Sequence, residues 1–349
     1  MKVGFFVCSN GYGHFIRVSK IAKEIKKLDP SCEIDIFCEQ YQIDKFQSIL
    51  VDDFNYIPYK SSNINWNTYL GGIRFDYDEY IIWLSQYKDV INDYDVVVSD
   101  NIVGLLKYRS DTILSSSFLW HDVMIDKFSN NPDALKLYEF EQNLLTKYKP
   151  NMLCVEDIVM ESIKYSTNPI YTGWCCDSNE IKEPTKNIEN FVFISPSLGY
   201  DISYTNTFLK IAKGLKESKY NVYLSNDLYN MRDDNFYFKF EYKNFKKMSK
   251  NSVFVFRPGV GTITDCVQYN SPMILVYSEN DSKEIVHLAN RVEELKIGLN
   301  VLVNTNFSGM FKYSILHPGA FLQLMNKFRT NLFRLNKNGH INSAKYILS

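Results

Sequence analysis

The chain has 349 residues and a mass of 40.8 kDa, which exceeds an average domain and predicts two packed domains. Apolar residues make up 45% and charged residues 23% of the sequence, values typical of a globular protein, so a disordered chain is excluded. The 39 Lys and Arg against 40 Asp and Glu offer no overall cationic excess, so we expect no nucleic-acid partner.

The first half of the chain alternates predicted strands and helices. The apolar run "KVGFFVC" at 2–8 predicts a buried parallel strand, and apolar residues at roughly helical spacing over 16–28 predict the helix after it. Further strands are predicted at 34–38, 94–100 and 111–117. Strand–helix–strand units join parallel strands, so this half is predicted to form an open α/β sheet.

The second half repeats this pattern after a polar stretch at 173–190 that lacks periodicity and is interpreted as a linker. Its strands are predicted to begin near residues 191, 221, 252 and 272. We therefore predict two α/β domains, 1–172 and 191–349, with the last helix packing back on the first domain as an open alternative. Ligands of such folds usually bind at the carboxyl ends of the strands, so we expect a cleft there between the two sheets.

The loop after the first strand contains one of two Gly-x-Gly pairs in a chain that uses glycine sparingly, and it also contains His14. A third glycine of the dinucleotide fingerprint would fall at Ile16, so no NAD site is expected. A neutral imidazole at the sheet edge can accept a proton from an attacking hydroxyl, and Asp100 should lie at the same edge and orient it. Two alternatives stay open: His14 stabilises the turn, or Asp100 caps the next helix.

Two loops of the second half fit a nucleotide diphosphate. Gly259, Gly261 and Thr262 open a predicted helix, whose free N–H groups and hydroxyl can receive phosphate oxygens. Asp265 lies one turn further on, where a carboxylate can accept hydrogen bonds from ribose hydroxyls. A smaller loop of the same kind contains Ser195, Ser197 and Gly199.

The seven cysteines form neither a CxxC pair nor a Cys/His zinc pattern, so we predict reduced thiols and no metal site. Reduced thiols are typical of the cytoplasm. The N-terminus becomes polar too early for a signal peptide, and no run of about 18 apolar residues predicts a membrane span. We therefore expect a cytoplasmic protein.

In these loops the chain resembles the GT-B glycosyltransferases, particularly the branch related to MurG, the UDP-N-acetylglucosamine transferase of peptidoglycan synthesis. "GYGHFIR" is similar to that branch's G-x-G-H loop, and "FRPGVGTITD" to its donor signature, an Arg or His before x-G-x-x-T-[VI]-x-[ED]. "SPMILVYSENDSKEIVHLAN" resembles the run that ends in Q-x-x-N. The motifs cover about 1–20 and 191–300, and the likeness over 40–170 is architectural. The resemblance implies two Rossmann-like parallel-sheet domains that face each other across a cleft.

The resemblance also implies a nucleotide-sugar donor, a UDP-sugar in the first instance, bound mainly by the second domain. The residues that it assigns to donor binding are Gly11, Gly13, Ser195, Ser197, Gly199, Arg257, Gly259, Gly261, Thr262, Asp265, His287 and Asn290. Three positions depart from the family pattern: Asp265 replaces a glutamate, His287 a glutamine and Tyr277 a proline. A shorter carboxylate reaches less far toward ribose, so the donor sugar stays open.

We therefore predict a glycosyltransferase that moves a sugar from a nucleotide-diphosphate donor to an acceptor hydroxyl in glycan or glycolipid synthesis. The predicted reaction is metal-independent and inverting, needs no other cofactor, and uses His14 as the base with Asp100 orienting it. A nucleotide-sugar hydrolase or epimerase of the same fold is an alternative, as is a nucleotide-binding protein without catalysis. The aromatic stretch at 65–88 leaves peripheral contact with the inner face of a membrane open, against burial or acceptor binding.

Overall fold

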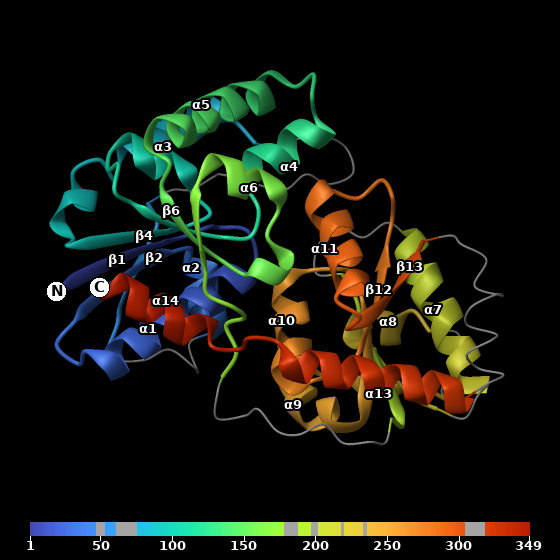
Figure 1. Ribbon diagram of the computed structural model, residues 1–349. Coiled ribbons are helices and arrows are strands. Elements are labelled where there is room, and N and C mark those ends of the chain that lie inside the picture. The colour runs from blue at the N-terminus through green and yellow to red at the C-terminus, as the bar shows by residue number, and fades with distance from the viewer. Residues whose placement is uncertain are drawn as a thin grey trace. The chain divides into compact units, whose positions relative to one another are not determined.

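The computed structural model describes residues 1–46, 53–60, 75–177, 188–196, 202–217, 220–232, 236–303 and 318–349. The chain divides into two compact units (Figure 1). The first unit comprises Met1–Cys175, Ser282–Glu284 and Asn338–Ser349, and the second comprises Cys176–Asp281 and Ile285–Lys337.

The first unit is built on a seven-stranded sheet in the order β3-β2-β1-β4-β5-β6-β7, and its described strand pairs run parallel. The strands are β1 (Lys2–Val7), β2 (Glu33–Cys38), β3 (Asn55–Pro58), β4 (Val96–Asp100), β5 (Ile113–Ser115), β6 (Asn151–Cys154) and β7 (Asn168–Tyr171). From β1 the chain adds β2 and β3 on one side of the sheet and then β4 to β7 on the other side. The direction of the strand order therefore reverses between β1 and β4, and the loops that follow these two strands lie at this topological switch point. The predicted open α/β sheet is confirmed.

The helices of this unit form where apolar spacing and capping residues favour them. In α1 (Gly13–Leu28) the residues Phe15, Val18, Ile21, Ala22 and Ile25 form one buried stripe. The helix α5 (Pro132–Tyr148) begins with an Asn131 cap and a proline in its first turn, and it ends at Lys149 in the left-handed conformation. The other helices are α2 (Gln40–Phe46), α3 (Tyr77–Ser85), α4 (Trp120–Lys127), α6 (Glu161–Ser166) and α14 (Gly339–Ile347).

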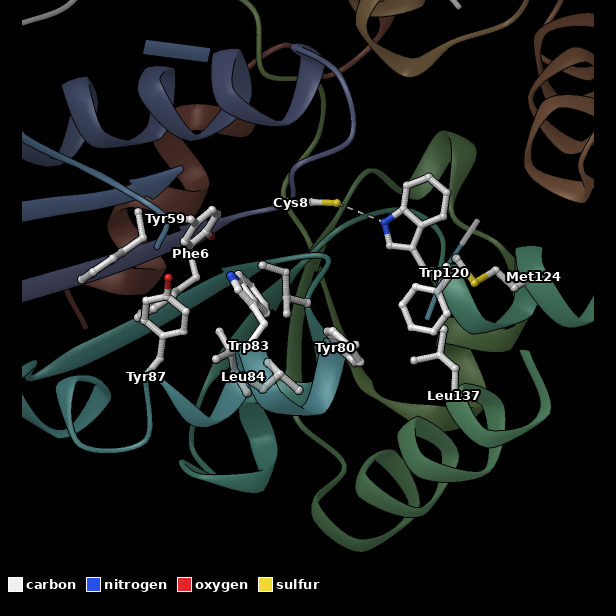
Figure 2. Packing of buried hydrophobic residues seen from close by; sticks show 14 of the residues in the cluster. Phe6, Cys8, Tyr59, Tyr80, Trp83, Leu84, Tyr87, Trp120, Met124 and Leu137 are labelled. Carbon is white, nitrogen blue, oxygen red and sulfur yellow. Dashed lines mark hydrogen bonds between the residues drawn. The ribbon is translucent and has the colours of Figure 1, made fainter. Parts of the chain in front are cut away.

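An aromatic core packs in the first unit (Figure 2). It includes Phe6, Tyr59, Tyr80, Trp83, Tyr87 and Trp120, and hydrogen bonds satisfy the polar atoms of several of these rings. The Tyr59 hydroxyl donates to the Val7 carbonyl at 2.8 Å, and the Trp120 indole donates to Cys8 Sγ at 3.2 Å. Of the aromatic stretch at 65–88, residues 65–74 lie outside the described residues, and the described Phe75, Tyr80 and Trp83 are buried. None of the described helices is both long and apolar enough to cross a bilayer.

The second unit contains a six-stranded sheet in the order β10-β9-β8-β11-β12-β13, again with parallel described pairs. Its strands are β8 (Asn190–Ile194), β9 (Asn221–Ser225), β10 (Phe238–Phe240), β11 (Ser252–Phe256), β12 (Met273–Tyr277) and β13 (Gly298–Leu302). Its helices are α7 (Ile202–Glu217), α8 (Asn226–Asn230), α9 (Phe245–Met248), α10 (Val260–Tyr269), α11 (Lys283–Glu294) and α13 (Pro318–Arg334). The repeated α/β pattern predicted for this half is confirmed.

The C-terminal helix α14 lies beside α1 in the first unit (Figure 1). Its Ala344 and Ile347 join the core beneath α1. The chain enters α14 beside residues of the predicted linker: Gly339 N–H donates to the Trp174 carbonyl at 2.9 Å, and the Trp174 side chain is fully buried. Residues 178–187 of that linker lie outside the described residues.

We predict that Gly339→Ala destabilises the protein. A Cβ at this position would lie 2.2 Å from the Gly173 carbonyl oxygen, a backbone atom that cannot move without shifting the chain. Overpacking of this kind costs about 1–3 kcal/mol. Gly319→Ala is the matched control, because a Cβ there meets no atom within 4 Å. Urea unfolding should show a lower midpoint only for the first variant, and equal midpoints would contradict the prediction.

Candidate active site

His14 stands at the switch point of the first sheet, in the loop between β1 and α1. Gly11 turns this loop with a φ of +75°, a conformation that favours glycine. The Gln42 side-chain amide donates to the carbonyls of Cys8 at 3.2 Å and Gly11 at 2.7 Å, so α2 holds the loop in place. His14 is therefore presented by the first turn of α1 from a fixed loop.

Asp100 lies next to His14 because β4 pairs with β1. It is the last residue of β4 and stands in register with Val7, the last residue of β1. His14 Nδ1 is 2.5 Å from Asp100 Oδ1, and the side-chain exposure is 12% for His14 and 0% for Asp100. The structure thus brings together the two residues that the sequence predicted at this edge.

Arg17 completes the cluster and was not predicted from the sequence. Its Nη2 donates to both Asp100 oxygens at 2.8 Å, and its Nε donates to Oδ2 at 3.1 Å. His14 and Arg17 are three positions apart in α1, a spacing that places both side chains on one helix face. The spacing in the sequence could have indicated that Arg17 lies beside His14. It could not indicate that both contact Asp100, because that contact depends on the pairing of β1 with β4.

Asp100 does not cap a helix, which was the alternative interpretation. The short 3-10 helix Val103–Lys107 follows with Ile102 at its N-cap and no side-chain capping bond. Both Asp100 oxygens instead accept hydrogen bonds from the side chains of His14 and Arg17.

The Asp100 carboxyl is ionised although it is fully buried. Burial raises its pKa, but the positive charge of Arg17, the interaction with His14 and their hydrogen bonds together hold the pKa below its ordinary value. A carboxylate has no proton to donate, so the proton of the His14–Asp100 hydrogen bond belongs to Nδ1. In the neutral imidazole the lone pair is then on Nε2, the nitrogen able to accept a proton.

In the second unit the predicted glycine loop follows β11 and opens α10. Gly259 is the N-cap residue with φ −164°, and no side chain caps the helix. A Cβ at Gly259 would meet no atom within 4 Å, so the space beside this helix N-terminus is open in the unit. Gly261 and Thr262 occupy the first turn, where free N–H groups and the helix dipole favour an anion.

Asp265 is engaged by a tyrosine from the preceding segment. The Tyr242 hydroxyl donates to Asp265 Oδ2 and also interacts with Thr262. The Tyr242 ring is half exposed, but its hydroxyl end lies against α10, where burial and then the charge of Asp265 raise the pKa of Tyr242 well above its ordinary value. The phenol therefore stays protonated and acts as the donor. Tyr242 is a second site residue that the sequence did not reveal.

Arg257 is held by Asp281 at the same sheet edge. Its Nη2 donates to Asp281 Oδ1 at 2.7 Å, while Oδ2 accepts from the Ser278 N–H at 2.9 Å and from the Tyr204 hydroxyl. Asp281 lies in the segment after β12, and strand adjacency brings it to the residue that follows β11. The guanidinium that the resemblance assigns to donor binding is thus already paired with a carboxylate.

The remaining predicted donor residues belong to the segment after β8 or to α11. Ser195 follows β8 and bridges to the next strand, with its N–H donating to Ser225 Oγ at 3.0 Å and its hydroxyl to Asp227 at 3.1 Å. Ser197 and Gly199 lie outside the described residues. His287 and Asn290 are three positions apart on α11, half-buried and exposed respectively.

Two features bear on metals and thiols. All seven cysteines are buried and none forms a disulfide. Within the described ranges, no group of three His, Cys, Asp or Glu side chains is arranged to hold a metal ion. Whether the reaction needs a metal stays a prediction from the sequence.

The sequence matches no protein-family model and no curated protein. The structure is similar over nearly its whole length to the glycotransferase of kitacinnamycin, with a TM-score of 0.67, 12% identity and coverage of 99% of this chain and 98% of that chain. A UDP-glucosyltransferase from Polygonum tinctorium capable of glucosylating indoxyl has a TM-score of 0.67 at 11% identity, covering 99% and 97%. Phytolacca americana UGT2, complexed with UDP-2fluoro-glucose and pterostilbene, has a TM-score of 0.64 at 12% identity, covering 96% and 93%.

At these identities the comparison establishes the fold. The chain has the GT-B architecture of two parallel-sheet Rossmann-like units, as predicted. The resemblance to the MurG-like branch remains a prediction from the motifs.

We predict that Asp100→Asn destabilises the protein at neutral pH by about 2–4 kcal/mol, because Arg17 would keep a partly buried charge without its anion. The pKa of Asp100 is depressed, so its stabilising effect is complete above the ordinary carboxyl range and disappears as pH falls through the lower, folded-state value. Urea unfolding at pH 7 and near pH 3 should show the difference between variant and parent shrinking in acid.

The matched control for Asp100→Asn is Asp111→Asn. Asp111 pairs with Arg109 at 2.8 Å, but its side chain is 70% exposed. An exposed pair contributes little, so this variant should stay within about 1 kcal/mol of the parent. Equal effects of the two substitutions at pH 7 would contradict the assignment of Asp100 as the buried, ionised partner.

Proposed function

We propose that the protein is a glycosyltransferase that moves a sugar from a nucleoside-diphosphate donor to an acceptor hydroxyl. The observation that supports this most strongly is His14 with its Nδ1 on the buried, ionised Asp100, in a chain with the GT-B fold. The donor proposed is a UDP-sugar, since a protein of this fold was solved with UDP-2fluoro-glucose and the loop that opens α10 is similar in sequence to the donor signature of the GT-B glycosyltransferases.

In the proposed reaction His14 is the base. As the acceptor oxygen attacks the anomeric carbon, its proton passes to His14 Nε2, and the imidazolium is stabilised by Asp100. The bond between the anomeric carbon and the diphosphate oxygen breaks, and the diphosphate leaves with the electron pair. Displacement in one step from the face opposite the leaving group inverts the anomeric configuration.

The departing diphosphate is proposed to lie at the N-terminus of α10. The backbone N–H groups beside Gly259 and Gly261, the hydroxyl of Thr262 and the helix dipole would stabilise the charge that develops there. Asp265 would accept from ribose hydroxyls and share its carboxylate with Tyr242. Arg257 would approach phosphate only by sharing or leaving Asp281.

The acceptor and its setting are proposed from the motif resemblance. A glycan or lipid-linked acceptor hydroxyl and metal-independent transfer follow the MurG-like branch, and a cytoplasmic site of action follows the predicted reduced thiols. Peripheral contact with a membrane belongs to the same proposal. Because the described aromatics Phe75, Tyr80 and Trp83 are buried, such contact would have to use other residues of the chain.

We predict that His14→Ala lowers kcat by about 10²–10⁴-fold while donor affinity is kept, because loss of a general base affects the chemical step. Turnover would be measured with a panel of UDP-sugars and acceptors, and UDP binding by calorimetry. Tyr12→Phe is a control in the same loop that leaves the imidazole in place. If His14→Ala turns over like the parent, the base assignment is wrong.

The same assays separate the proposed function from its alternatives. Release of free sugar or an epimer from the donor without acceptor would indicate a hydrolase or epimerase. Tight UDP binding without turnover on any acceptor would indicate a binding protein. Either result would refute glycosyl transfer.

We predict that Asp265→Ala raises the donor KM about 10-fold or more with a smaller change in kcat. The variant loses hydrogen bonds from ribose to a charged acceptor, each of which contributes about 1.5–3 kcal/mol. Glu294→Ala is the control, since this carboxylate is exposed at the end of α11 and pairs only locally with Arg291. A donor KM that stays at the parent value in Asp265→Ala would exclude the ribose assignment.

A further inference from the structure

We infer that Arg17 is a positioning residue of the site. Its guanidinium orients Asp100 toward His14 and balances part of the carboxylate charge that the imidazole faces. This inference rests on the proposed function only in taking His14 as the base.

The first part of the argument is geometric. Arg17 binds Asp100 as a fork, with Nη2 at 2.8 Å from each oxygen and Nε at 3.1 Å from Oδ2. The same Nη2 lies 3.3 Å from the Ser115 carbonyl at the end of β5, so Arg17 contacts the ends of two adjacent strands. A planar fork bound to both oxygens fixes the plane of the carboxylate, and this leaves Oδ1 directed at His14.

The second part concerns charge. Arg17 Nη2 is 3.3 Å from His14 Nδ1. A guanidinium only donates, and Nδ1 already donates its proton to Asp100, so this contact is not a hydrogen bond. If the imidazole is protonated, two cations face each other across this distance. Asp100 favours the imidazolium and Arg17 opposes it, and the two effects offset one another.

The other titratable groups around the cluster are the thiols of Cys8 and Cys175 and the ammonium of Lys20. Burial raises the pKa of the Cys8 thiol to about 12, and burial also raises the pKa of Cys175. The Lys20 ammonium donates to the Cys175 carbonyl at 3.1 Å. The Phe118 ring packs edge-on against the imidazole, at 6.4 Å between centroids. Asp100 and Arg17 are therefore the charged side chains that contact His14 in the described structure.

This arrangement suits a base that must be regenerated in every cycle. A buried carboxylate without a second cation beside it would favour the imidazolium more strongly. With Arg17 present, Asp100 still sets the tautomer and orientation, while its charge is largely compensated. The expected consequence is a change in the pH dependence of His14 when Arg17 loses its charge.

The test is histidine NMR on the full-length protein, which needs no substrate. With 15N-labelled histidine and long-range 1H–15N spectra, the His14 signals are assigned by their loss in His14→Gln. The parent should show the Nδ1–H tautomer. In Arg17→Gln the pH midpoint of the His14 titration should rise by about 1 unit or more, since Asp100 is then uncompensated. Arg17→Lys, which keeps the charge, should stay close to the parent.

A double variant keeps the inference testable if Arg17→Gln alone does not fold. In Asp100→Asn/Arg17→Gln both charges are absent, so no buried ion is left alone, and the midpoint should return toward that of the parent. A midpoint in Arg17→Gln that is unchanged or lower, or one that rises equally in the double variant, would overturn the inference.

Activity provides a second readout that is separate from folding. If the parent transfers sugar, the acid limb of its kcat/KM profile should move to higher pH in Arg17→Gln, with activity recovered in alkaline buffer. Loss of activity at every pH would mean that Arg17 is merely structural. Absence of transfer by the parent would refute the proposed function, while the NMR midpoints would still decide the role of Arg17.

Discussion

The carboxyl edge of the first sheet is organised around the buried negative charge of Asp100. The carboxyl is fully buried at the end of β4, and burial alone would favour its neutral form. It stays ionised because Arg17 contacts both of its oxygens and His14 donates to one of them. The ionised carboxylate in turn selects the His14 tautomer and holds the first turn of α1 against the ends of β1 and β4. One anion thus connects the sheet, the helix start and the imidazole.

The two units use the carboxyl edge of a parallel sheet in different ways. In the first unit the loop after β1 presents a side chain, His14, whose state is set by charged neighbours. In the second unit the loop after β11 exposes backbone N–H groups at the N-terminus of α10. No side chain caps this helix at Gly259, and the space beside Gly259 is open. Side chains around that helix are already hydrogen-bonded, Asp265 with Tyr242 and Arg257 with Asp281. A donor bound there would have to share these partners or displace them, which makes them candidates for tuning donor affinity.

The strands that the sequence did not predict are short or lie at sheet edges, and the reason is physical. β3 and β7 are the two edge strands of the first sheet, and each contains a proline, which a central strand does not tolerate. β10 is an edge strand of three residues, two of them exposed. A strand with one neighbour and a solvated side lacks the continuous apolar run that identifies buried parallel strands such as β1 and β11. The central strands other than the four-residue β6 could therefore be predicted, whereas these edges could not.

The sequence by itself determined the repeated α/β pattern, the loops that follow β1 and β11, and the presence of His14 and Asp100 at strand ends. Periodicity and loop composition are local properties, so they can be read along the chain. Only the tertiary structure decided which side chains meet. Arg17 and Asp100 are separated by 83 positions, and Tyr242 reaches Asp265 over 23. These pairs form because strand pairing and helix packing bring the ends of different elements to the same edge of a sheet. The spacing of residues along the chain does not show which distant residues will meet there. Whether Asp100 was a helix cap or a partner of His14 depended on the same long-range packing.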